Sequence, residues 1–108
     1  MEKFVAEKPD LTLELTTLEG EEITLEPTQV MSGKGALEIT EKWSKLEKEE
    51  KEKGDEGKSP FEILAIELAY VYPKNAEWFL ENIDFGTLNE ILIYVAQTIG
   101  GIKKKSKK

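Results

Sequence analysis

The sequence predicts a single α+β domain that is mostly helical, with an N-terminal β-hairpin packed with about four helices. Three observations favour this class. Apolar and polar residues alternate near the N-terminus, which indicates strands. Later segments begin with helix-capping residues and continue with apolar residues at helical spacing. The chain has 108 residues, of which 39% are hydrophobic, and this length suits one small domain, expected at residues 1–102.

The hairpin is expected at residues 11–26. Leu11, Leu13 and Leu15 lie on one face of a strand and polar residues lie on the other. The same alternation returns after a break that contains Gly20, where a tight turn needs a positive φ. An isolated two-stranded hairpin is marginal in water. Its leucine face must therefore be covered by a helix or by strands from another copy.

The helices are expected at about residues 36–53, 60–72, 76–82 and 88–99. In the first, apolar residues recur at steps of three and four from Ala36 to Leu46, which indicates one apolar stripe. Charged residues predominate after Leu46, so the end of this helix is expected to be solvated. A flexible link is expected at residues 54–58.

Capping residues mark the other three helices. Ser59 and Glu62 form a predicted capping box with a proline between them, and Pro73 ends this second helix. Asn75 is expected to cap the third helix. Thr87 and the glutamate three residues later predict a second capping box, at the start of the fourth helix.

The charge distribution argues against several classes of function. The formal net charge is −7, from 22 acidic residues and 15 lysines, and the chain has no Cys, His or Arg. Five lysines lie in residues 103–108, an expected disordered tail, so the remaining ten leave the body at −12. An acidic body repels nucleic-acid phosphates, and no segment approaches the roughly 20 apolar residues of a transmembrane helix. No secretory signal is evident, so a cytoplasmic location is expected.

Candidate catalytic and metal-binding groups are few. Residues 33–35, Gly-Lys-Gly, resemble part of a phosphate-binding loop, but Thr28 stands where that loop needs its first glycine. Glu77, Glu81 and Asp84 could hold a divalent ion or act as an acid–base pair. Because no His, Arg or second acidic cluster completes a site, we interpret them as solvated surface. We therefore expect no enzyme activity, no cofactor and no metal.

The second and fourth helices are apolar nearly all round, which is unusual for surface helices of a small domain. One interpretation places them at the centre of the core, between the hairpin and the first helix. The other leaves part of their surface exposed in the monomer, to be buried in self-association or against a partner helix. Both can hold together. The expected core or partner-facing residues are Ile63, Leu64, Ile66, Tyr70, Trp78, Phe79, Leu88, Ile91, Leu92 and Val95.

The order of the segments is itself informative. A hairpin ending in T-L-E-P-T precedes a helix, a charged link, and the segments S-P-F-E-I-L-A-I-E-L-A-Y-V-Y-P and A-E-W-F-L-E-N-I-D-F-G-T-L-N-E-I-L. Over most of residues 11–99 this order resembles the tail assembly chaperones of long-tailed (siphovirus-type) bacteriophages and prophages. The shared motifs are packing and capping signals rather than catalytic ones.

The resemblance implies a non-enzymatic, mostly helical protein of the host cytoplasm. Such a protein binds the phage tape-measure protein and keeps it soluble, helps to recruit tail-tube subunits, and leaves before the virion is complete. A homo-oligomer is also expected. The main alternative is a structural tail or connector subunit that stays in the virion, and an enzyme is a distant third.

Overall fold

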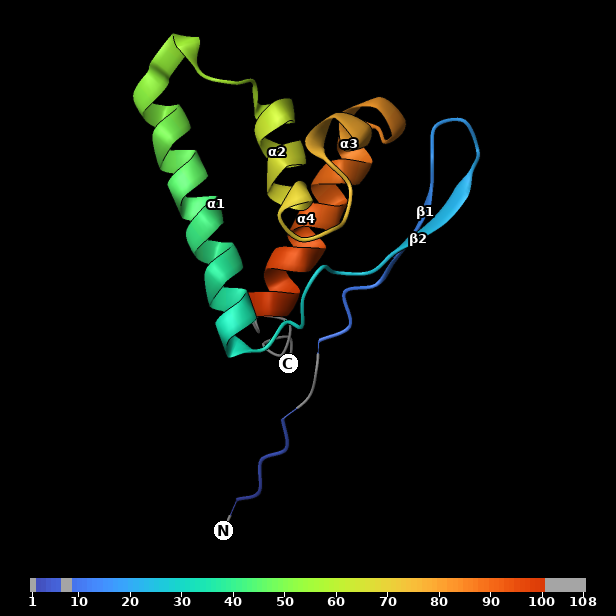
Figure 1. The fold of residues 1–108 in the computed structure, drawn as a ribbon, viewed down its shortest axis with the longest axis vertical. Helices are drawn as coiled ribbons and strands as arrows, with labels where there is room; N and C mark the ends of the chain where they lie inside the picture. Colours follow the sequence, from blue (N-terminus) through green and yellow to red (C-terminus); the bar gives the residue numbers. More distant parts are fainter. Residues whose placement is uncertain (1, 7–8, 101–108) are drawn as a thin grey trace.

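The computed structural model describes residues 2–6 and 9–100, and it confirms the mostly helical α+β class (Figure 1). Figure 1 shows α1 and the hairpin on opposite sides of α2 and α4. The expected tail at residues 103–108 lies outside the described residues. The elements in chain order are β1 (Leu13–Thr16), β2 (Glu22–Leu25), α1 (Gly33–Lys53), the 3₁₀ turn η1 (Gly54–Glu56), α2 (Pro60–Ala69), α3 (Ala76–Asn82) and α4 (Phe85–Gly100).

The hairpin has one apolar face, as the alternation predicts. Strands β1 and β2 are antiparallel, and their register places Leu13 opposite Leu25 and Leu15 opposite Ile23. The three leucines are buried, and Ile23 packs at the edge of the same core. Gly20 in the turn has a φ of 93°, a conformation that residues with a Cβ rarely adopt. These leucines share one core cluster with side chains of α1, α2, α3 and α4.

Hydrogen bonds attach both ends of the hairpin to the segment that follows α2. The Tyr72 hydroxyl donates to the Leu11 carbonyl at 2.6 Å, and both groups are buried. After the second strand, the Thr28 N–H donates to the Val71 carbonyl at 2.8 Å. Burial raises the pKa of Tyr72 well above its ordinary value, so this phenol remains a hydrogen-bond donor at neutral pH.

The core lies around α2, which contacts α1, α3 and α4. From α1, Ile39 is fully buried and Leu46 nearly so; beyond Leu46, the single buried residue of the described helix is Glu50. The outer half of α1 is therefore solvated, as its charged sequence predicts. The buried core residues of the other helices are Leu64, Ala65, Leu68, Phe79, Leu88, Ile91 and Val95.

Three helix boundaries differ from the expected ones. Helix α1 begins at Gly33, earlier than predicted, because the Ser32 hydroxyl accepts a hydrogen bond from the Gly35 N–H at 3.2 Å. Helix α2 begins with the predicted capping box but ends at Ala69. The chain then turns towards Pro73, which disfavours helical geometry in the residue before it.

Helix α4 begins at Phe85 rather than near residue 88, and the predicted cap at Thr87 was wrong. A carboxylate oxygen of Asp84 accepts a hydrogen bond from the Thr87 N–H at 3.1 Å, and the Asp84 carbonyl accepts one from the Leu88 N–H at 3.0 Å. Asp84 is therefore the N-cap and Thr87 lies inside the first turn.

The segment expected to be a flexible link has a defined course around Glu50. The Lys58 N–H donates to one carboxylate oxygen of Glu50 at 2.6 Å, and the ammonium groups of Lys53 and Lys58 lie 3.2 and 3.4 Å from the other. These contacts, led by the Lys58 N–H, lower the pKa of Glu50. Glu50 thus ties the end of α1 to the approach to α2.

Candidate functional site

The ten residues expected in the core or at a partner surface divide evenly by exposure. None of them belongs to the strongly exposed apolar residues of the described chain. Leu64, Phe79, Leu88, Ile91 and Val95 are buried, and Ile63, Ile66, Tyr70, Trp78 and Leu92 are partly buried. Of the partly buried residues, Tyr70, Trp78 and Leu92 pack against the core, so eight of the ten contribute to it.

Other apolar residues, from four parts of the fold, surround a surface hollow of about 250 Å³. The hairpin turn contributes Leu18, α2 contributes Phe61, α3 contributes Leu80 and α4 contributes Phe85. Their exposed fractions are 64, 50, 38 and 43%, respectively. The buried side chains of Ile83 and Leu88 complete the lining. We call this feature the apolar hollow.

Local structure explains how these side chains meet. Phe61 and Phe85 lie in the first turns of α2 and α4, and their rings pack edge to face with centroids 4.4 Å apart. The Leu18 N–H donates to the Asn82 carbonyl at 2.9 Å, which holds the hairpin turn against the end of α3. The hollow is therefore built where two helix starts, one helix end and one turn converge.

One carboxylate lies at the apolar hollow. Asp84 is part of the lining and is exposed. Hydrogen bonds from the side chain and backbone of Thr87 lower the pKa of Asp84, so it is ionised at neutral pH. The described lining contains no basic side chain.

The size and lining of the hollow favour binding of an apolar side chain over chemistry. About 250 Å³ lies below the roughly 300–1,000 Å³ of sites that hold small molecules. Asp84 is its one ionisable lining residue, and it already caps α4. Among the described residues no group of three or more His, Cys, Asp or Glu is placed to hold a metal.

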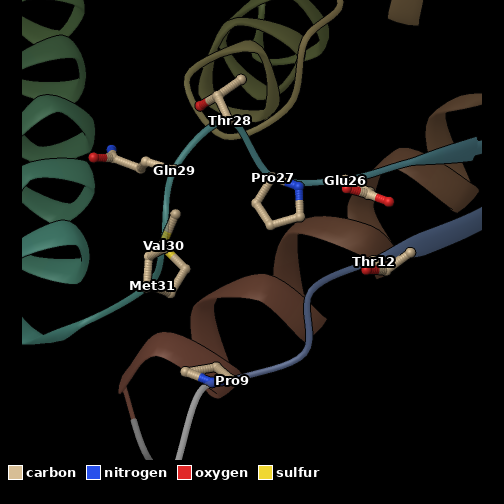
Figure 2. Close-up of a pocket in the computed structure, with 8 residues that line it drawn as sticks. All are labelled: Pro9, Thr12, Glu26, Pro27, Thr28, Gln29, Val30 and Met31. Carbon is tan, nitrogen blue, oxygen red and sulfur yellow. The ribbon is translucent and has the colours of Figure 1, made fainter.

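A second hollow, of about 350 Å³, lies between the N-terminal segment and the connection from β2 to α1 (Figure 2). Its polar side chains do not converge. Figure 2 shows Gln29 pointing towards α1 and Thr28 towards the α2–α3 connection, with Glu26 and Thr12 beside the strands. Glu26 is the single ionisable side chain of its lining. We therefore assign this hollow no function.

One titratable group is buried between α1 and α2. The exposed fraction of Glu67 is 4%, and its backbone carbonyl accepts a hydrogen bond from the Trp43 indole N–H at 3.0 Å. Burial, followed by a hydrogen bond and repulsion from the Glu47 carboxyl group, raises the pKa of Glu67 to about 8. This group influences stability at neutral pH, as developed below.

The sequence did not identify the four rim residues as a site. Phe61 lies inside the predicted capping box, Phe85 lies before the expected start of the fourth helix, and Leu80 has bulky apolar neighbours. Leu18 gave the clearest signal, because it is an apolar residue in a turn beside three glutamates.

Comparisons with protein-family models, curated proteins and solved structures found no match to this chain. Within the described residues, no helix combines the length and the hydrophobicity needed to cross a membrane.

Proposed function

We propose that this protein is a non-enzymatic assembly chaperone whose apolar hollow binds the apolar face of a partner helix. The observation that supports the proposal is the cluster of four half-exposed apolar side chains, from four elements, around one surface hollow. Exposed apolar patches of this kind mark interaction sites. The partner class follows from the segment order, which resembles that of phage tail assembly chaperones.

In this proposal the partner is the tape-measure protein, a long helical chain with apolar stripes. An amphipathic helix presents apolar residues three and four positions apart, and one such side chain fits the hollow while its neighbours contact Phe61 and Phe85. The acidic body keeps the complex dispersed, since net charge opposes aggregation. The protein acts in the host cytoplasm, helps to recruit tail-tube subunits and is released before the virion is complete.

Co-expression with a tape-measure fragment tests the proposal. Wild-type protein is expected to raise the soluble fraction of the fragment and to co-purify with it. Leu80→Asp should abolish both effects, because it places a charge on the rim of the hollow. Leu37→Asp is the matched control, since Leu37 is also exposed but lies in α1. Equal rescue by both variants, or no co-purification with wild type, would contradict the proposal.

The same hollow also suits a permanent contact in a tail or connector subunit. Mass spectrometry of purified virions separates the two roles: a chaperone is absent from the particle, whereas a structural subunit is present in stoichiometric amounts.

A further inference from the structure

We propose that residues 2–6 of one copy add as a third strand to the outer edge of β2 in a second copy. We call residues 2–6 the arm. Its side chains Phe4 and Val5 have exposed fractions of 89 and 78%, the highest among the large apolar residues of the described chain. The arm belongs to no helix or strand, and within the described residues no backbone hydrogen bond involves it. It therefore offers apolar side chains and backbone groups to another molecule.

The outer edge of β2 has free backbone groups that can accept an added strand. The Thr17 N–H donates to the Glu21 carbonyl at 2.8 Å, and hydrogen-bonded pairs alternate along an antiparallel ladder. With the observed register, Glu22 and Thr24 therefore direct their N–H and carbonyl groups away from β1. In the part of the chain that the structure describes, no third strand pairs with them. An extended peptide binds such an edge through main-chain hydrogen bonds.

Burial on the apolar face of the hairpin selects β2 rather than β1. Leu13 and Leu15 of β1 are each 8% exposed. Ile23 lies opposite Leu15 but is only partly buried, at the edge of the core. A third strand beside β2 covers Ile23 with a further apolar side chain, whereas β1 has little apolar surface left to cover.

The side chains of the arm match this edge when the arm runs parallel to β2. Alternate residues of a strand lie on opposite faces. With Phe4 beside Ile23 on the apolar face, Ala6 then lies beside Leu25 on the same face. An antiparallel arm centred on the same pair would place Glu2 beside Leu25 instead. Because a carboxylate is costly on an apolar face, the pattern favours the parallel alignment.

Charge complementarity supports the same alignment. Residues of both strands line a surface hollow of about 520 Å³, which includes Glu14 and Glu22 and no basic side chain. Both glutamates are exposed. When Phe4 lies on the apolar face, Lys3 lies on the face of these glutamates and beside Glu22. The arm therefore supplies a positive charge where the hairpin is acidic.

The direction of the arm favours a second copy over its own hairpin. Between the arm and β1, the Tyr94 hydroxyl donates to the Asp10 carbonyl and the Tyr72 hydroxyl to the Leu11 carbonyl, both at 2.6 Å. Figure 1 shows the arm leaving the body away from the hairpin. To reach the outer edge of its own β2, it would have to reverse and cross the hairpin. A reciprocal exchange between two copies uses both arms and both edges and closes as a two-fold dimer.

Sedimentation velocity of the full chain over a range of concentrations tests the exchange. Wild type is expected to form a dimer. Phe4→Asp places a charge where the arm covers Ile23. Thr24→Pro removes an N–H that points away from β1, so it blocks the edge and leaves the β1–β2 ladder intact. Each variant should dimerise at least about tenfold more weakly than wild type.

Two controls match these changes. Leu37→Asp adds the same charge at an exposed apolar position in α1. Thr16→Pro removes the corresponding outward N–H from β1, since Thr16 lies opposite Glu22. Both controls should dimerise as wild type does. Circular dichroism of the two proline variants verifies that each keeps the wild-type fold.

Reversing the charges tests the alignment of the arm. Lys3→Glu and Glu22→Lys should each weaken the dimer, because each places like charges side by side. An equimolar mixture of the two variants should recover association, since both contacts of the mixed dimer then join opposite charges. Raising the salt concentration should reduce the difference between the mixture and the single variants.

Four results would overturn the proposal: a monomeric wild type at every concentration, a Phe4→Asp dimer as strong as that of wild type, equal weakening by Thr16→Pro and Thr24→Pro, or no recovery in the charge-reversed mixture. The proposed function is tested separately, because no residue of the apolar hollow takes part in the exchange. Phe4→Asp should still solubilise the tape-measure fragment.

Discussion

Replacing Glu67 by Gln should change how the stability of the protein depends on pH. The carboxyl group of Glu67 is buried between α1 and α2, and its pKa rises from 4.5 to about 8 on folding. Between these two values the folded state holds a proton that the unfolded state releases. The contribution to stability is therefore complete below pH 4.5 and is lost as the pH rises towards 8. Glutamine keeps the size and stays neutral, so it removes this dependence.

The two pKa values set the magnitude. One pKa unit corresponds to about 1.36 kcal/mol, and linkage between 4.5 and 8 gives a loss of about 2.5 kcal/mol between pH 5.5 and 7.5. A hydrogen bond and repulsion from the Glu47 carboxyl group add to the effect of burial on the pKa of Glu67. With an m-value of about 1–2 kcal/mol/M, the urea midpoint of wild type should fall by roughly 1.2–2.5 M relative to that of Glu67→Gln over this pH range.

Urea denaturation at pH 5.5, 6.5 and 7.5 and constant ionic strength, followed by circular dichroism, provides the measurement. Glu41→Gln is the control, because Glu41 is an exposed glutamate of α1, the helix that packs against α2 beside Glu67. Its midpoints should follow those of wild type at every pH. Parallel curves for wild type and Glu67→Gln would refute the reasoning, since they would show that Glu67 does not bind an extra proton in the folded state.

Three further substitutions test the fold. Tyr72→Phe should lower the free energy of unfolding by about 1–3 kcal/mol, because it leaves the buried Leu11 carbonyl without its donor; thermal denaturation measures the loss, and an unchanged midpoint would contradict it. Phe79→Ala should cost about 3–5 kcal/mol by creating a cavity at a fully buried site, as checked by urea denaturation. Asp84→Ala should reduce helicity and thermal midpoint more than Thr87→Ala, because Asp84 caps α4; the reverse order by circular dichroism would restore the cap to Thr87.

The sequence predicts those features of the fold that depend on neighbouring residues. The capping box at Ser59 and Glu62 forms as expected, since both partners lie within one turn and no rival cap is close. The start of α4 was missed because Asp84 and Thr87 are both good caps three residues apart. Local preference does not decide between them. The choice depends on where Ile83 is buried and how the chain leaves α3.

The apolar hollow could not be predicted in the same way, because its members come from four elements. In the sequence, Phe61 resembles any apolar residue in a first helical turn, and Phe85 lies before the expected start of the fourth helix. They become a rim because the α2–α4 contact brings the two turns together. The residues of α2 and α4 that were expected in the core or at a partner surface were chosen because these helices are rich in apolar residues. A high apolar content does not show which face of a helix is buried.

The two-stranded sheet has a consequence for the solution behaviour of the protein. Within the described chain, β1 and β2 pair with each other and with no third strand, so each offers an open edge of the kind that seeds fibrils. Glu14 and Glu22 project from the exposed face. Stacking identical ribbons in register would place like charges side by side. These two glutamates therefore oppose amyloid-like stacking of the ribbon at high protein concentration.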